Sequence, residues 1–340
     1  MKKILLAILL VWIPLTTFAV KVSSLYRADV LVLSQSDDEK EKAARIGLTQ
    51  ILIKLTGDAE IESDPKTQLA LKNALSYVQE FSYSSSGENQ YTIHILYDKT
   101  SLKNLLKKSD KAYWGENRPL TLIWLDVTNP HQATEVIGSE SPSHVLNRIK
   151  QQGKKYGLPV IFPIMDMADL VEVSTEDIKS MNTDLLKQAS KRYRASVILI
   201  GKIENEMQSQ WQLIFENKQW DWMITGKSID EMTNAALYKT SQIFAKNFAV
   251  KTKDAANNWL TIEVAQVNDN ENLQLLLHYL KQLTSVQQVN LSQITGDAVQ
   301  LSILIHGSLT SFQQNALIGQ HLLLKAEEPE QNKLIYEWVR

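Results

Sequence analysis

The chain has 340 residues, a formal net charge of −2 and a charged fraction of 22%. A chain with this balance and no basic stripe is a poor candidate for binding nucleic acid or anionic lipid, because both depend on clustered Lys and Arg. It contains no cysteine, which excludes disulfides, thiolate metal sites and cysteine-based catalysis. We expect two or three domains that are stabilised by packing.

The first nineteen residues have the layout of a secretory signal peptide. Lys2 and Lys3 precede an uncharged apolar run over residues 4–15, and Thr17 and Ala19 occupy the small-residue positions of a cleavage site. The run is shorter than the roughly 20 residues of a spanning helix. We therefore predict cleavage after Ala19, no transmembrane segment in the mature chain, and a location in the periplasm of a Gram-negative-type bacterium. Loss of two lysines leaves the mature chain with a net charge of −4.

The first predicted domain, residues 20–113, has an α+β pattern. The elements in chain order are a strand at 26–33, a helix between a capping box at Ser36 and a left-handed cap at Gly57, a helix from Pro65, strands at 77–84 and 91–97, and a basic helix at 101–108. This succession predicts a small α+β layer pair. Residues 114–119 read as a linker.

The second predicted domain, residues 119–250, alternates strands and helices. The elements are strands at 120–127, 159–164 and 195–203, helices at 143–156 and 175–193, a hairpin of 211–215 and 220–225, and a closing helix at 229–250. The first strand is continuously apolar, which is typical of a strand buried on both faces. The order predicts an α/β core with a mostly parallel sheet and an added antiparallel hairpin.

The third predicted domain, residues 259–340, returns to an α+β pattern. The elements are a strand at 259–267, a helix at 270–283, a hairpin of 287–294 and 299–305, a helix at 308–318, and strands at 321–326 and 333–339. Its opening order of strand, helix, strand, strand and helix resembles that of the first domain without a sequence repeat. The expected fold class is therefore α+β and α/β, in three small α/β-type domains.

No motif in the sequence predicts a catalytic centre, a metal site or a cofactor. The six histidines do not share a helix at metal-binding spacing, and no His-Glu-x-x-His, Gly-x-Gly-x-x-Gly or Gly-x-Ser-x-Gly motif occurs. We therefore expect no cofactor and no metal. A non-catalytic role is favoured over an enzymatic one.

Two residues are candidates for a ligand or partner surface near the central sheet. Asp166 follows the second central strand, at the carboxyl edge where open α/β sheets bind ligands. His131 lies in the loop at 128–142 with acids near it in sequence, and loops carry function more often than cores do. Asp166 and Glu204 are also the acids that a glycan hydrolase would use, in a cleft with two convergent carboxylates.

Period-two alternation places six apolar residues of the hairpin on one face: Trp211, Leu213, Phe215, Trp220, Trp222 and Ile224. The expected register pairs Phe215 with Trp220 across a four-residue turn. One interpretation is an aromatic platform for sugars such as peptidoglycan strands, built on Trp211, Trp220 and Trp222. The other is a face buried under the helix at 229–250, which we favour because an exposed patch of that size would promote aggregation.

Several motifs of the first domain resemble one known family. They are Tyr-Arg-Ala-Asp-Val at 26–30, Ala-Ala-Arg-Ile-Gly-Leu at 43–48, Ile-Leu-Ile-Lys-Leu-Thr-Gly at 51–57 and Tyr-Val-Gln-Glu-Phe-Ser-Tyr at 77–83. With them the chain resembles an uncharacterised family of exported gammaproteobacterial proteins, known as a domain of unknown function, over most of the mature chain. Lys54 stands where that family would have arginine. The resemblance implies an envelope location and no established activity, so no functional residue is carried over.

The middle domain resembles, in its strands at 120–127 and 195–201 and its Trp-bearing hairpin, the α/β domain of periplasmic assembly and regulator proteins. Examples are the amino-terminal domain of TolB and the lipoprotein activators of cell-wall synthases. Our leading hypothesis is a non-catalytic envelope protein, an interaction or assembly module for an envelope protein or for peptidoglycan. The alternatives are a hydrolase acting on envelope glycans and a periplasmic protein that binds a small ligand.

Overall fold

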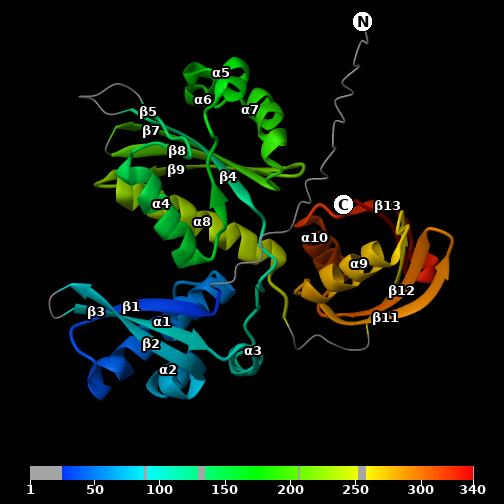
Figure 1. The fold of residues 1–340 in the computed structure, drawn as a ribbon, viewed down its shortest axis with the longest axis horizontal. Helices are drawn as coiled ribbons and strands as arrows, with labels where there is room; N and C mark the ends of the chain where they lie inside the picture. The colour runs from blue at the N-terminus through cyan, green and yellow to red at the C-terminus, as the bar shows by residue number, and fades with distance from the viewer. Residues whose placement is uncertain (1–24, 88–89, 129–134, 206, 252–257, 340) are drawn as a thin grey trace, which may run out of the picture.

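The computed structural model describes residues 25–87, 90–128, 135–205, 207–251 and 258–339. The predicted signal peptide lies outside these ranges. Three sheets form from successive stretches of chain, each packed against helices (Figure 1), and the fold class is α+β and α/β, as predicted. Of the helices within these ranges, none combines the length and apolar character needed to cross a bilayer.

The N-terminal sheet is antiparallel, with the strand order β1-β3-β2. Its elements are β1 (Arg27–Val32), α1 (Asp37–Thr56), η1 (Ile61–Ser63), α2 (Pro65–Lys72), η2 (Ala74–Tyr77), β2 (Val78–Gly87), β3 (Gln90–Tyr97) and α3 (Lys99–Lys108). The side chain of Ser36 caps α1 by accepting the N–H of Glu39, and Gly57 ends the helix at φ 68°. Both ends of α1 therefore follow the sequence signals.

Only one face of this sheet is covered. Along β1, Ala28 and Val30 are buried in the core under α1, whereas Arg27, Asp29 and Leu31 are exposed. Strict alternation of buried and exposed residues is the mark of a sheet with one face on the core and one in solvent. The second face is open, and the site described below lies on it.

The central sheet is mixed, with the strand order β5-β4-β7-β8-β9 and β6 paired to β4. Its strands are β4 (Thr121–Val127), β5 (Glu135–Val136), β6 (Val160–Ile161), β7 (Val197–Asn205), β8 (Gln208–Phe215) and β9 (Lys218–Thr225). β4 runs parallel to β6 and β7, and β7, β8 and β9 are antiparallel. Every residue of β4 is buried, as its apolar run predicts.

Helices cover both faces of the central sheet (Figure 1). They are α4 (His144–Tyr156) and α8 (Ile229–Phe248) on one face, and α5 (Met167–Glu172), α6 (Thr175–Lys179), α7 (Thr183–Ser190) and η3 (Lys191–Tyr193) on the other. The single helix predicted over 175–193 is wrong, because Met181 takes a left-handed conformation with φ 54° and separates α6 from α7. The strand predicted at 159–164 is reduced to the two residues of β6, and α5 was not predicted.

The register predicted for the β8–β9 hairpin is also wrong, by two residues. Trp211 pairs with Trp222 and Leu213 with Trp220. The four-residue turn is replaced by a two-residue turn that brings Phe215 opposite Lys218, with Glu216 at φ 51°. A shift of two leaves each side chain on its original face, so the six apolar residues still share one face.

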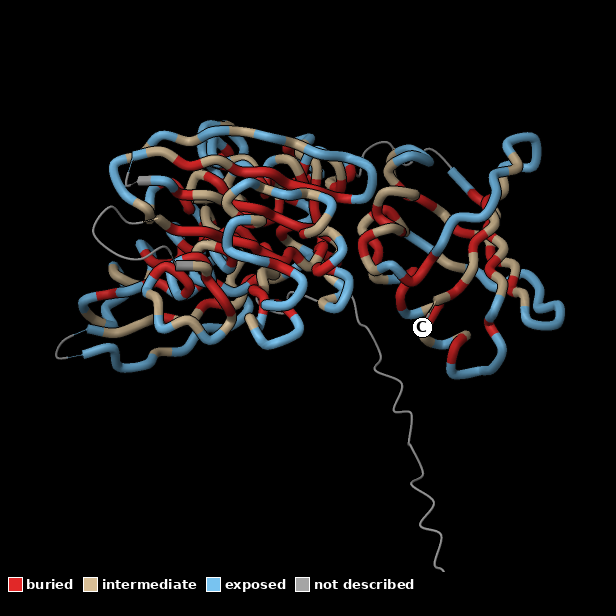
Figure 2. The backbone as a smooth tube through the Cα atoms, turned by 90° about the horizontal axis from the view of Figure 1, so that it is seen from above, coloured by how far each residue is buried: buried red, intermediate tan, exposed pale blue. Residues whose placement is uncertain are grey.

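The C-terminal sheet has the strand order β11-β12-β10-β14-β13. Its elements are β10 (Trp259–Ala265), α9 (Asn270–Gln282), β11 (Val286–Thr295), β12 (Ala298–Ile305), α10 (Leu309–Leu317), β13 (Leu322–Glu328), η5 (Pro329–Gln331) and β14 (Lys333–Trp338). The antiparallel order β10-β12-β11 matches β1-β3-β2 strand for strand. The likeness in element order therefore extends to strand pairing. Figure 2 shows the buried segments of this sheet as a group apart from those of the other two.

The three sheets are joined by packed junctions. Segment 114–119, read from sequence as a linker, contains the fully buried Trp114 and Arg118. An antiparallel bridge pairs Tyr113 with Val250. The Asn315 side-chain amide donates to the Phe248 carbonyl at 3.2 Å and so joins α10 to the end of α8.

Candidate functional site

Asp166, the leading sequence candidate, is the N-cap of α5. Its carboxylate accepts the N–H groups of Ala168 and Asp169, both at 3.1 Å, and forms two bonds of 2.7 Å with the Arg192 guanidinium. The Arg192 bonds, helped by the backbone N–H groups, hold the Asp166 pKa well below its usual range. A carboxylate held in this way suits a structural role better than proton transfer.

A second carboxylate extends this arrangement. Asp169 is fully buried and accepts the N–H of Met165 at 2.8 Å, Nη1 of Arg192 at 2.9 Å and the hydroxyl of Tyr193. Burial, with the bond to Asp169, raises the pKa of Tyr193 to about 12. The bonds fix the backbone at Met165, which has φ 59°, and join α5 to η3.

The other acids and the loop histidine give no shared centre in the described residues. Glu204 is exposed and pairs with Lys202 at 2.6 Å. Asp166 and Glu204 are therefore bound to different cations and do not form one centre. His131 lies outside the described residues. Asp126 is buried near the carboxyl end of β4, where burial raises its pKa and Oδ2 accepts the Thr128 hydroxyl. Across the described ranges, no three His, Asp or Glu side chains gather as metal ligands.

The three hairpin tryptophans belong to the core beneath α8. Trp211 is 2% exposed, and its indole N–H donates to the Ser209 hydroxyl at 2.8 Å. Trp220 and Trp222 are half-buried and pack against the cluster that contains Met232 of α8. This face is covered by helix, so it does not present the three rings as a platform for sugars.

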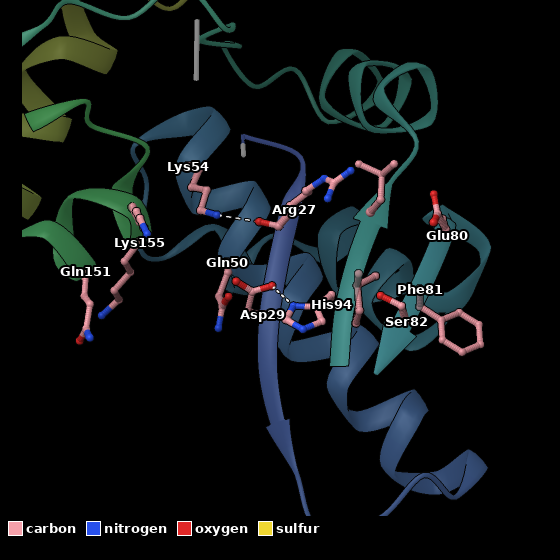
Figure 3. A pocket seen from close by; sticks show the side chains of 13 residues that line it. Arg27, Asp29, Gln50, Lys54, Glu80, Phe81, Ser82, His94, Gln151 and Lys155 are labelled. Carbon is pink, nitrogen blue, oxygen red and sulfur yellow. Dashed lines mark hydrogen bonds and ion pairs between the residues drawn. The ribbon is translucent and has the colours of Figure 1, made fainter. Parts of the chain in front are cut away.

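A cleft of about 950 Å³ lies on the open face of the N-terminal sheet. Its strand residues are Arg27 and Asp29 of β1, His94, Ile95 and Leu96 of β3, and Glu80, Phe81 and Ser82 of β2. From α1 come Gln50 and Lys54, and from the last turns of α4 come Gln151, Lys154 and Lys155. Figure 3 shows the α1 and α4 side chains beside β1, on the side away from β3. The cleft is thus bordered by a strand edge and two helices.

The charge of the cleft is positive. Four basic side chains, Arg27, Lys54, Lys154 and Lys155, line it with only two carboxylates, Asp29 and Glu80. In a concave site with low-dielectric walls, such an excess attracts anionic groups.

Lys54 is the unusual cation of this set. It is 6% exposed, and its ammonium donates to the Arg27 carbonyl at 2.9 Å (Figure 3). Within the described chain no carboxylate forms an ion pair with it. Burial lowers its pKa to about 8. An ammonium has three donors, so Lys54 retains donor capacity at the cleft.

Three polar side chains cross the sheet in a row. Nδ1 of His94 lies 2.7 Å from Asp29, and Nε2 lies 2.8 Å from the Ser84 hydroxyl. The order is that of a Ser–His–Asp triad, but such a triad works with a buried carboxylate in a site that excludes water. Here the Asp29 side chain is 70% exposed and that of His94 42%. The row is a cross-strand ladder that stiffens the cleft floor.

Sequence reasoning missed this cleft. The available signal was the alternation of Arg27 and Asp29 with apolar residues along β1, which implies an open face. Lys154 and Lys155 lie about a hundred residues further along the chain, and no local pattern connects them to Lys54.

One family model matches part of the chain. It is described as "Domain of unknown function (DUF8605)" and covers residues 19–115, a shorter stretch than the resemblance implied. A search of curated proteins finds no match. The matched residues hold the N-terminal sheet and most of the cleft lining, whereas the α4 lysines lie outside them. Residues 19–115 are therefore similar to an uncharacterised domain family.

Proposed function

We propose that this chain is an exported, non-catalytic protein of the cell envelope, an interaction or assembly module for an envelope protein or a cell-wall polymer. The observation that carries the proposal is the wide basic cleft on the uncovered face of the N-terminal sheet. A sheet face left open, with cations from three separate elements, is suited to a partner surface. As part of the same proposal, we take the middle domain to be similar to the α/β domain of periplasmic assembly proteins such as TolB.

The leader supports an exported location. Residues 1–19 have the positive, apolar and small-residue parts of a signal peptide, and the family match begins at residue 19. Fractionation of cells that express the full chain, with N-terminal sequencing of the product, tests this. We expect a periplasmic protein that begins at Val20. A cytosolic protein that retains Lys2 and Lys3 would contradict it.

A non-catalytic role is supported by the state of the candidate acids. Asp166 is held by Arg192, which keeps its pKa low, whereas Glu204 pairs separately with Lys202, so the two acids do not share the kind of centre that a glycan hydrolase needs. Zymography on peptidoglycan tests the hydrolase alternative. Clearing by the wild-type protein that disappears in Asp166→Asn would overturn the non-catalytic proposal.

Partner binding is tested by crosslinking in cells, followed by pull-down. The informative variant reverses the charge of the α4 lysines, Lys154→Glu with Lys155→Glu. A matched control reverses Lys107 and Lys108, an exposed pair in the last turn of α3 that does not line the cleft. We expect specific envelope crosslinks with the wild type and the control and their loss in the α4 variant. Equal crosslinking by all three would show that the cleft is not the binding surface.

A further inference from the structure

The cleft is bordered by the outer edge of β1, and this edge retains free backbone groups. Among the described strands, β1 pairs with β3 alone. The N–H of Tyr97 donates to the Tyr26 carbonyl at 3.0 Å, and residues of an antiparallel pair alternate between bonding the partner and pointing away. Arg27, Asp29 and Leu31 therefore direct their N–H and C=O groups outward. The bond from Lys54 to the Arg27 carbonyl comes from that outer side.

An edge with free N–H and C=O groups at strand spacing is a template for another strand. Strand addition is a recurring mode of peptide recognition, in which main-chain bonds provide affinity and side-chain contacts provide specificity. The space for such a strand is the cleft itself, because Gln50 and Lys54 of α1 and Gln151 of α4 lie beyond the β1 edge (Figure 3). A peptide backbone matches the edge, whereas a glycan offers no regular amide spacing to pair with it.

The basic side chains of the cleft indicate that the incoming strand is acidic. Lys54 stands at the Arg27 end of the edge, where its ammonium bonds the Arg27 carbonyl, and it is nearly buried with donor capacity left. Lys154 and Lys155 line the same cleft. A carboxylate on the incoming strand would satisfy that capacity through charge-assisted hydrogen bonds. Toward the other end, Leu31 is 59% exposed and Leu33 68%. These two side chains offer an apolar contact for alternate residues of the strand.

We propose that β1 accepts an extended acidic segment of an envelope protein as a fourth strand of the N-terminal sheet. This inference rests on the proposed function and names its partner class. The incoming backbone pairs with Asp29 and Leu31, its acidic side chains bind Lys54 and the α4 lysines, and an apolar side chain packs on Leu31.

The test uses the whole mature chain and an eight-residue fluorescent peptide of alternating Glu and Val, with binding measured by anisotropy. Leu31→Pro removes the outward N–H at position 31, and proline is tolerated at a strand edge where the N–H faces solvent. Leu31→Ala keeps that N–H and is the matched control. Loss of one main-chain hydrogen bond and its neighbours weakens binding about tenfold or more. We expect this loss in Leu31→Pro relative to Leu31→Ala, and also in Lys154→Glu with Lys155→Glu.

Changes in the peptide keep the test independent of protein folding. A peptide with proline at a central position and one with Gln in place of Glu should each bind the unmodified protein about tenfold more weakly, and added salt should weaken the Glu peptide. Failure of the Glu peptide to bind, or equal binding of all three peptides, overturns the inference.

Failure of strand addition can be distinguished from failure of the proposed function. Envelope crosslinks that survive Leu31→Pro but vanish in the α4 lysine variant would retain the proposed function and overturn strand addition. Co-sedimentation with isolated peptidoglycan that the Glu peptide does not displace would identify a glycan partner and overturn it as well. Absence of specific crosslinks in the wild type would reject the proposed function itself.

Discussion

Arg118 stacks on Trp114 where the N-terminal and central sheets meet, with its guanidinium carbon 3.5 Å from the centroid of the indole. Both side chains are fully buried. The guanidinium donates to the carbonyls of Lys54 at 2.7 Å and Gly157 at 3.4 Å, and also to those of Gly115 and Trp114. Lys54 belongs to α1 and Gly157 ends α4, so one cation joins the two helices that border the cleft.

Replacement of Arg118 should destabilise the protein strongly. Arg118→Met keeps much of the apolar stem but leaves buried carbonyls without donors, which we expect to lower the free energy of unfolding by about 3 kcal/mol or more. Urea unfolding measures this. Arg148→Met is the control, because the Arg148 side chain is 56% exposed and pairs with Asp230 on the surface. Similar midpoints for the two variants would show that the Arg118 bonds contribute little.

The Leu-Thr-Gly motif ends α1 at Gly57, which packs against α8. This contact distinguishes Gly57 from Gly296, a glycine with a similar backbone conformation and no close neighbour. Gly57 has φ 68°, and an added Cβ would lie 2.4 Å from Cβ of Ala245. Gly296 has φ 63° with nothing within 4 Å. Both substitutions by Ala incur the left-handed penalty of about 1 kcal/mol, but Gly57→Ala adds a steric clash. Thermal unfolding should show at least twice the loss in Gly57→Ala, and equal losses would argue against the contact.

Helix caps and apolar runs in the sequence correctly predicted the elements whose bounds or burial depend on neighbouring residues alone. Ser36 and Gly57 delimit α1, and the apolar run of β4 is buried on both sides. Two of the errors fall where a non-glycine residue takes a positive φ, as Met181 does between α6 and α7 and Glu216 does in the hairpin turn. Neither residue type signals such a conformation, because the surrounding fold imposes it.

The candidate site was less predictable than the fold. Asp166 stands near the carboxyl end of a central strand, but its place as a helix cap bound to Arg192 depends on a helix that the pattern did not reveal. The cleft needs α4 to lie beside β1, and Arg118, which in the sequence is part of a polar linker, joins the end of α4 to α1 through the carbonyls of Gly157 and Lys54. Contacts between residues far apart in the sequence produce no local hydrophobic pattern, so the cleft could not be predicted from the sequence.

The assignment of Trp211 to the core can be tested by comparing its truncation with that of a more exposed tryptophan, Trp259. Trp211 is 2% exposed, and Trp259 is 38% exposed at the start of β10. Because truncation of a buried aromatic residue leaves a cavity, Trp211→Ala should lower the free energy of unfolding by about 3–5 kcal/mol. Trp259→Ala should lose less than half of that. Comparable losses in chemical unfolding would contradict the assignment of Trp211 to the core.

Lys54 should make stability depend on pH in the alkaline range. Burial holds its pKa at about 8 in the folded protein, against about 10.4 in an unfolded chain. Between these values the unfolded chain binds the extra proton, so stability rises as pH increases from 8 to 10. Below pH 8 the buried charge costs up to about 3 kcal/mol, at roughly 1.4 kcal/mol per pKa unit.

Lys54→Met should remove both effects. We expect the variant to be more stable than the wild type at pH 7 and to lack the rise in unfolding free energy between pH 8 and pH 10, as measured by urea unfolding at each pH. Lys42→Met on the same helix is the matched control, because that side chain is 68% exposed and should leave the rise intact. If the wild type and Lys54→Met changed in parallel across this range, the buried ammonium would not be the source of the rise.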